Sequence, residues 1–248
     1  MKIRVLFLLS FMLLSACKQN VEKQATEITP QPAEFKFHHE VRMPKITSAN
    51  PPLLLLLHGL GSNEKDLFSF AQYLDPKLLV ISARAPINIG ADRYSWFGLS
   101  SSPEGWTYDI ADVNKVSEDL MIYIDQISKT HNVDNSKIFI GGFSQGAILS
   151  LATGLPNSGK IAGIVCLSGR LYPELKPELS SIKNFNGLEL FISHGTQDKV
   201  LPYSDIESDV EYLKGLGLSP TVKYYEAAHT ISRDNFRDIV AWLSVNLE

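Results

Sequence analysis

Short apolar runs recur along the chain and are separated by longer segments with helical spacing. The clearest run is a row of five leucines at positions 53–57, bounded by prolines and a glycine-containing turn. Such a run is typical of a strand buried on both faces of a parallel sheet. Similar runs predict strands at 78–82, 137–141, 161–167, 188–193 and 221–225, and partial alternation predicts an edge strand at 35–43.

Between these strands, apolar residues recur every three or four positions, as they do on one face of a helix. In the longest such segment, 111–129, the residues Val113, Val116, Leu120 and Ile124 share one face. Shorter segments predict helices at 66–74, 145–153, 205–214 and 232–245. Strands that alternate with helices indicate an α/β fold with a mostly parallel sheet covered on both faces. In such folds the active site lies beyond the carboxyl ends of the strands.

The N-terminal segment has the pattern of an export signal. A basic start, Met1–Arg4, precedes an apolar run from Val5 to Leu14. The run ends in Leu-Ser-Ala-Cys at 14–17, which resembles the lipobox of bacterial lipoproteins. The resemblance implies that Cys17 becomes a lipid-bearing N-terminus, which would anchor the protein to a bacterial membrane outside the cytoplasm. An ordinary signal peptide with an incidental cysteine is the alternative.

The remainder of the chain divides into a tether and one domain. Residues 18–34 are polar and contain two prolines, so they predict a flexible tether with no core of its own. Residues 35–248 are long enough for a single α/β domain. We therefore expect a signal peptide at 1–17, a tether at 18–34 and a folded domain at 35–248.

Charge and cysteine content exclude several classes of partner. The formal net charge is -4 and no run of Lys and Arg occurs, which argues against a nucleic-acid partner. The chain has two cysteines and no CxxC pair or zinc-ligand spacing. We expect no metal and no cofactor, because the serine chemistry inferred below requires neither. Cys166 stands in an apolar run and is expected to be a buried packing thiol.

Residues 142–146 read Gly-Phe-Ser-Gln-Gly and match the pattern G-x-S-x-G. The match follows the predicted strand at 137–141 and precedes an apolar helical segment. A strand, a sharp turn and a helix are the setting of a nucleophile elbow, in which the serine is exposed at the top of the sheet. Ser144 is therefore the predicted nucleophile, and the alternative is a glycine-rich turn with an ordinary serine.

A serine nucleophile needs a base and an acid, which follow it in this fold in the order serine, acid, histidine. Only His194 and His229 follow Ser144 among the six histidines. His229 lies between the last predicted strand and the terminal helix, and Asp198 follows the strand at 188–193. His194 precedes this acid and is expected to support the loop. Glu226 is the second candidate acid, but it is only three residues from His229.

Two backbone N–H groups are expected to stabilise the oxyanion of an acyl-transfer reaction. The residue after the nucleophile, Gln145, supplies one of them in this fold. The other comes from the loop after an early strand, here residues 58–61, His-Gly-Leu-Gly. Glycines allow close backbone approach there. We expect His58 to pack and form hydrogen bonds rather than to catalyse, and a simple strand-ending turn is the alternative interpretation of the loop.

Taken together, these segments resemble the phospholipase/carboxylesterase family of α/β-hydrolases, which includes acyl-protein thioesterases. The matching stretches are LLLHGLGSNEKDLF, RAP at 84–86, WF at 96–97, GGFSQGA, HGTQDKVLP and AAHTIS. The resemblance covers residues 36–247 and implies an α/β-hydrolase that cleaves carboxylic esters or thioesters through an acyl-enzyme. It also implies that the oxyanion N–H groups belong to Leu60 and Gln145. Two departures, Ser-Asn-Glu at 62–64 and Ala228 before the histidine, weaken a thioesterase assignment.

The aromatic segment 94–108 lies where a lid or the wall of an acyl pocket would be. In that case Trp96 and Phe97 would bind the substrate, a small-molecule ester. A packed surface loop is the equal alternative. Two other functions remain open at this point: deacylation of a polysaccharide or other extracytoplasmic substrate, and a binding lipoprotein that uses a hydrolase scaffold without catalysis.

Overall fold

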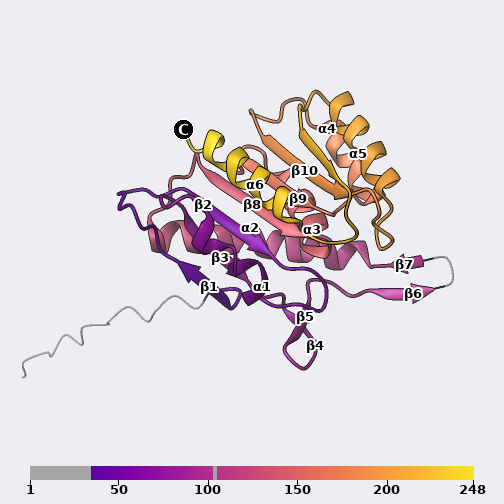
Figure 1. Ribbon diagram of the computed structural model, residues 1–248, viewed down its shortest axis with the longest axis horizontal. Coiled ribbons are helices and arrows are strands. Elements are labelled where there is room, and N and C mark those ends of the chain that lie inside the picture. Colours follow the sequence, from indigo (N-terminus) through magenta and orange to yellow (C-terminus); the bar gives the residue numbers. More distant parts are fainter. Residues whose placement is uncertain (1–34, 103–104) are drawn as a thin grey trace, which may run out of the picture. The chain divides into compact units, whose positions relative to one another are not determined.

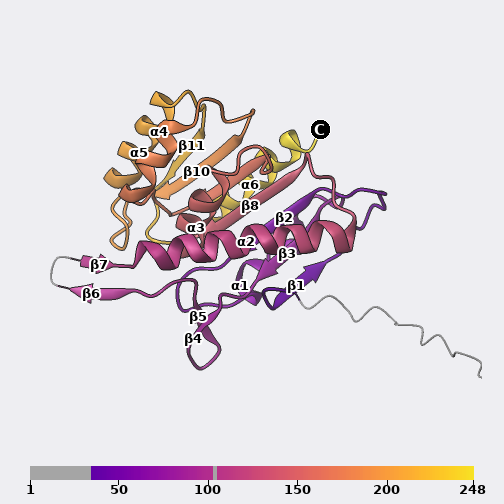
Figure 2. The same cartoon turned by 180° about the vertical axis from the view of Figure 1, so that it is seen from behind.

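The computed structural model describes residues 35–102 and 105–248 and contains a seven-stranded sheet at its centre. The strand order is β1-β3-β2-β8-β9-β10-β11 (Figures 1 and 2). Only β1 is antiparallel to its neighbour, β3, and all other adjacent strands are parallel. The strands are β1 (His39–Arg42), β2 (Leu53–Leu57), β3 (Leu79–Ala83), β8 (Ile138–Phe143), β9 (Gly163–Leu167), β10 (Glu189–Gly195) and β11 (Thr221–Tyr225). The predicted α/β fold with a mostly parallel sheet is confirmed.

Helices cover both faces of the sheet, as Figures 1 and 2 show from opposite sides. Apolar residues of α2 (Ile110–His131), α3 (Gln145–Gly154), α4 (Lys176–Ser181) and α5 (Tyr203–Gly215) belong to one core. Residues of α6 (Arg233–Asn246) belong to a second core on the other face, beside α1 (Lys65–Phe68). Within residues 35–102 and 105–248, no helix combines the length and the apolarity that crossing a membrane requires.

The leucine row of β2 supplies both cores. Successive side chains of a strand point to opposite faces of the sheet. Leu53, Leu55 and Leu57 accordingly pack in the core that contains α2 and α3. Leu54 packs in the core that contains α6. An uninterrupted apolar row is therefore what a strand needs when both faces of its sheet are covered.

Some predicted elements are shorter than expected, and some observed elements were not predicted. The expected strand at 35–43 is reduced to β1, because only its residues 39–42 pair with β3. The expected helix at 66–74 splits into α1 and a 3-10 turn, η1 (Ala71–Tyr73), and Pro76 restricts the backbone just beyond it. The elements that were missed are β4 (Ile87–Gly90), β5 (Arg93–Ser95), β6 (Ser100–Ser102), β7 (Gly105–Thr107), η2 (Pro173–Leu175) and α4.

The missed strands form two short hairpins, β4–β5 and β6–β7, that project from the body in Figure 1. Each strand has only three or four residues and pairs with the other strand of its hairpin. Such short strands show no extended apolar alternation in the sequence. The signal peptide, Cys17 and the tether at 18–34 lie outside the described residues, and the predicted division at residue 35 stays a prediction.

Candidate active site

Ser144 lies at the turn that joins β8 to α3. Its φ of 55° and ψ of -117° lie outside the regions that non-glycine residues usually adopt. The turn is tight enough to require glycine at positions 142 and 146, on either side of the serine. A methyl group on Gly146 would lie 2.1 Å from the carbonyl oxygen of Leu57, and one on Gly142 would lie 2.4 Å from the backbone of Gly146. The geometry is that of a nucleophile elbow, with the serine presented at the carboxyl end of β8.

Three of the predicted site residues are joined by hydrogen bonds. His229 Nε2 lies 2.8 Å from Ser144 Oγ, and His229 Nδ1 lies 2.6 Å from Asp198 Oδ2. The three residues come from three different strand ends, since Ser144 follows β8, Asp198 follows β10 and His229 follows β11. A neutral imidazole in this arrangement donates from Nδ1 to the carboxylate and accepts the serine proton at Nε2. That is the geometry which general-base activation of a serine requires.

The carboxylate of Asp198 is held ionised by its hydrogen bonds. Burial by itself would raise the pKa of Asp198, but the hydrogen bond from His229 and those from two backbone N–H groups outweigh it and lower the pKa. The backbone donors are Val200 and Leu201, at 2.8 and 2.9 Å from Oδ1. As expected, His194 supports this loop, because its Nε2 lies 2.9 Å from the carbonyl oxygen of Leu201. An ionised Asp198 can fix the tautomer of the imidazole beside it.

The loop that carries His229 packs closely against the end of β10. The N–H of Gln197 donates to the carbonyl oxygen of Ala227 at 3.0 Å. A methyl group on Gly195 would lie 2.3 Å from that same oxygen, so glycine is required at the contact. The sequence analysis did not identify this glycine, although its position in the HGTQD stretch was a signal. The contact sets the separation between the strand end bearing Asp198 and the loop bearing His229.

The two predicted oxyanion donors, Leu60 and Gln145, lie on segments that contact each other. A methyl group on Gly59 would lie 3.5 Å from Ser144 Cβ, so the loop at 58–61 packs directly against the elbow. Among the described residues, neither the N–H of Leu60 nor that of Gln145 has a hydrogen-bond acceptor. The N–H of Gln145 belongs to the first residue of α3, whose N–H groups have no partner within the helix. Both N–H groups are therefore free to bind an anion.

Trp96 and Phe97 are buried in the larger core, with 0% and 1% of their surface exposed. The indole Nε1 of Trp96 donates to the carbonyl oxygen of His58 at 2.8 Å. The side chain of Gln145 accepts from the N–H of Trp96 at 2.9 Å and donates to the carbonyl oxygen of Phe97 at 3.1 Å. The two aromatic residues thus connect the loop at 58–61 to the elbow. Their predicted contact with a substrate stays a prediction.

A buried ion pair next to the site was not identified from the sequence. The guanidinium of Arg84 donates two hydrogen bonds to Glu64, at 2.6 and 2.5 Å. The side chain of Glu64 is fully buried, and its pKa is lowered by the hydrogen bonds from Arg84. A signal was present, since the acid lies three residues after the loop at 58–61 and the arginine directly follows β3. Only the fold shows that the two residues meet.

In the described part of the chain, no group of three or more potential ligands could hold a metal ion.

Comparison with known proteins agrees with this geometry. A family model described as phospholipase/carboxylesterase matches residues 38–247. An acyl-protein thioesterase 1 of Candida albicans is 30% identical over 224 residues, which cover 82% of this chain and 95% of that protein. Another acyl-protein thioesterase 1, from Mycosarcoma maydis, is 29% identical and covers 77% of this chain and 89% of its own length.

Solved structures of esterases share the fold. The crystal structure of esterase PE8 superposes with a TM-score of 0.75 at 24% identity and covers 84% of this chain and 98% of its own. A carboxylesterase from Bacillus cereus superposes with a TM-score of 0.74 at 22% identity, covering 85% and 94% of the two chains. At these identities the likeness shows that the fold is shared, and the chemistry depends on the residues of the site.

Proposed function

The chain belongs to the phospholipase/carboxylesterase family, and on that premise we propose that it is a serine hydrolase that cleaves carboxylic esters through an acyl-enzyme on Ser144. The hydrogen-bonded chain from Asp198 through His229 to Ser144 carries this proposal. Ser144 is the nucleophile, His229 the general base and Asp198 the residue that orients the base. The N–H groups of Leu60 and Gln145 form the oxyanion hole.

Acylation begins when Ser144 Oγ attacks the ester carbonyl carbon and its proton passes to His229 Nε2. The carbonyl oxygen becomes an oxyanion, which the N–H groups of Leu60 and Gln145 stabilise. Asp198 stabilises the imidazolium that has formed. When the intermediate collapses, the bond from carbon to the alkoxy oxygen breaks and His229 returns its proton to that oxygen. The alcohol leaves and the acyl group remains on Ser144.

Deacylation repeats the same steps with water. His229 takes a proton from a water molecule while the water oxygen attacks the acyl carbon, and the same two N–H groups stabilise the second oxyanion. Collapse of this intermediate breaks the bond to Ser144 Oγ, which recovers its proton from His229. The carboxylic acid product is released and the enzyme returns to its starting state. The residues named complete this cycle among themselves, with the substrate and water.

We propose further that the enzyme acts outside the cytoplasm, on a lipid anchor at Cys17. The support is the basic and apolar start of the chain, which ends in Leu-Ser-Ala-Cys at 14–17. The polar segment 18–34 would then separate the catalytic domain from the membrane surface by a flexible tether. A membrane-bound position would suit an ester substrate that carries an acyl chain.

The test is hydrolysis of p-nitrophenyl esters of increasing acyl length by the wild-type protein and by Ser144→Ala. We expect turnover by the wild type and a loss of at least about 10⁴-fold in kcat in the variant, since removal of the nucleophile leaves only the residual catalysis of the site. The acyl length with the highest kcat/KM measures the size of the acyl site. Measuring kcat/KM for thioesters of the same acids shows whether the enzyme prefers an alcohol or a thiol leaving group.

The matched control is Ser150→Ala, which removes another buried serine, located within α3, whose hydroxyl donates to the carbonyl oxygen of Gly146. We expect this variant to turn over esters and to react with a fluorophosphonate probe, whereas Ser144→Ala should not react. If Ser144→Ala retains a tenth of the wild-type rate, the assignment of the nucleophile is wrong. If the folded wild type neither turns over esters nor reacts with the probe, the result favours a binding function on a hydrolase scaffold.

A further inference from the structure

The oxyanion hole of the proposed mechanism depends on the orientation of one peptide unit, that between Gly59 and Leu60. In a trans peptide the N–H points to the side opposite the C=O, and the described residues contain no cis peptide bond. Whatever fixes the direction of the Gly59 carbonyl therefore also fixes the direction of the Leu60 N–H. A methyl group on Gly59 would lie 3.5 Å from Ser144 Cβ, so this peptide adjoins the nucleophile.

The imidazole of His58 holds the Gly59 carbonyl. His58 Nδ1 lies 2.8 Å from the carbonyl oxygen of Gly59, and a carbonyl oxygen can only accept, so Nδ1 must carry a proton. On the other side of the ring, the N–H of Ala85 donates to His58 Nε2 at 3.1 Å. A ring nitrogen that accepts cannot carry a proton, so Nε2 must be bare. The two contacts agree on one state, the neutral ring with its proton on Nδ1.

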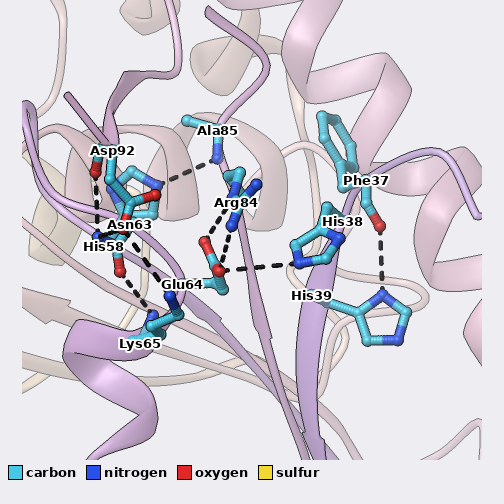
Figure 3. Close-up of polar contacts among 10 residues, drawn as sticks. All are labelled: Phe37, His38, His39, His58, Asn63, Glu64, Lys65, Arg84, Ala85 and Asp92. Atoms are coloured by element: carbon cyan, nitrogen blue, oxygen red, sulfur yellow. Dashed lines mark hydrogen bonds and ion pairs between the residues drawn. The ribbon is translucent and has the colours of Figure 1, made fainter. Parts of the chain in front are cut away.

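The donor to His58 Nε2 is itself held in place. Ala85 directly follows Arg84, whose guanidinium is paired with the buried Glu64 at the end of the same loop (Figure 3). Glu64 Oε1 also lies 3.8 Å from His38 Nε2. The loop from His58 to Glu64 is thus fixed to the chain after β3 at both of its ends, once through an imidazole and once through an ion pair.

From these contacts we propose that His58 is a positioning residue for catalysis, which aims the Leu60 N–H at the oxyanion by holding the Gly59 carbonyl. His58 is fully buried, so it does not touch the substrate and acts only through this peptide. The N–H of Ser62 also donates to the Gly59 carbonyl, at 3.2 Å, and closes the turn. The contact with the His58 ring, at 2.8 Å, is the shorter of the two. The inference rests on the proposed function, since it concerns the geometry of that oxyanion hole.

Two amide substitutions separate the contacts of the ring. In His58→Asn the side-chain amide reaches the position of Nδ1 and can donate to the Gly59 carbonyl, but nothing accepts from Ala85. In His58→Gln the amide oxygen reaches the position of Nε2 and can accept from Ala85, but the side chain no longer donates to the Gly59 carbonyl, which keeps only the longer hydrogen bond from the N–H of Ser62. Each variant therefore loses one hydrogen bond of a buried group, and thermal unfolding measures whether the two lose similar stability.

The kinetic readout is the division of the effect between kcat and KM. We expect His58→Gln to lower kcat about 100-fold with little change in KM, because a misplaced oxyanion donor weakens only the transition state. We expect His58→Asn to stay within about tenfold of the wild-type kcat, because the donor to the Gly59 carbonyl is kept. Equal kcat in the two variants, or a lower kcat in His58→Asn than in His58→Gln, would overturn the inference.

A measurement on the unmodified ring guards against a variant that does not fold. Nitrogen NMR of the full chain with ¹⁵N-labelled histidine distinguishes the two neutral tautomers, and the ring signals of His58 are assigned in the folded wild type through correlations with its own backbone. We expect the proton on Nδ1, and a proton on Nε2 would refute the inference. Failure of the proposed function is distinguishable, since it would remove wild-type ester turnover and fluorophosphonate labelling, whereas failure of this inference would leave both intact.

Discussion

At the scale of single residues, the surroundings of each histidine decide what its ring can do. His58 is fully buried, and backbone groups occupy both ring nitrogens. His229 has 16% of its side chain exposed, and its two nitrogens face Asp198 and Ser144. The first ring can hold a peptide but has no free nitrogen for a proton, whereas the second can take up and release one. The same side chain therefore serves positioning in one place and the proposed proton transfer in the other.

The neutral state of His58 predicts a dependence of stability on pH. Burial lowers the pKa of His58 and outweighs the hydrogen bond to the Gly59 carbonyl and the charges of Asp66 and Glu64, which raise it, while the charge of Arg84 lowers it further. Because the folded pKa lies below the unfolded value of about 6.5, the unfolded chain binds the proton more readily. The contribution of His58 to the free energy of unfolding is therefore fully present above about pH 6.5. It decreases as the pH falls from there towards the folded pKa, by up to about 1.4 kcal/mol per pH unit.

Urea unfolding at a series of pH values from 8 to 5 measures this contribution. We expect the unfolding free energy of the wild type to fall more steeply below about pH 6.5 than that of His58→Asn, which has no titrating ring. The other histidines are common to both proteins and cancel in the difference. Parallel curves for the two proteins would mean that His58 binds a proton equally well in the folded and unfolded states.

At the scale of elements, the site depends on how closely β8, α3 and β2 approach one another. The first turn of α3 packs against the carboxyl end of β2 so closely that a methyl group on Gly146 would lie 2.1 Å from the carbonyl oxygen of Leu57. This approach brings the loop after β2 to the nucleophile. The glycines of the G-x-S-x-G pattern are thus required for the packing between elements as well as for the turn itself.

Gly146→Ala is expected to destabilise the protein by about 3 kcal/mol, since the added methyl group meets backbone that cannot rotate away. Ester turnover should fall with it, because the elbow and the loop at 58–61 are forced apart. The matched control is Gly215→Ala at the end of α5, where a methyl group meets no atom within 4 Å. There we expect a gain of up to about 1 kcal/mol from helix propensity. Urea unfolding of both variants measures the difference, and equal stability would contradict this packing argument.

At the scale of the whole molecule, one sheet covered on both faces places all the proposed catalytic groups at one edge. The groups follow β2, β8, β10 and β11, and each strand is parallel to its neighbours in the sheet. Because parallel strands end at the same edge, residues far apart in the chain meet there. Ser144 and His229, for example, are 85 positions apart and in hydrogen-bond contact.

The proposed lipid anchor predicts where the full chain is found in a bacterial cell. We expect the wild type to take up labelled palmitate and to sediment with membranes, and Cys17→Ser to do neither, because stable anchoring needs the acyl chains. Cys166→Ala is the control, since this thiol is buried in the folded domain and should not affect the anchor. Labelling of Cys17→Ser equal to that of the wild type would contradict lipidation at this cysteine.

Some features of the molecule can be predicted from the sequence and others cannot. The strand at 221–225 was predicted with the bounds that the structure gives, because its local pattern and flanking turns are sufficient. Residues Ser144, Asp198 and His229 were selected from motif and order, and the structure brings them into contact. The hairpins β4–β5 and β6–β7 were not predicted, because their short strands are held by pairing rather than by an apolar pattern. The burial of Trp96 and Phe97 was also not decided by the sequence.

The sequence by itself determined the α/β class, the order of the main strands and helices, and the residues at the strand ends, since these follow from apolar periodicity and short-range turn sterics. Only the tertiary structure decided which partners those residues meet. The pairing of Glu64 with Arg84, and the hydrogen bond from the N–H of Ala85 to His58 Nε2, join segments that are distant in the chain. Such contacts arise when strands align and cores close, and no local pattern records them.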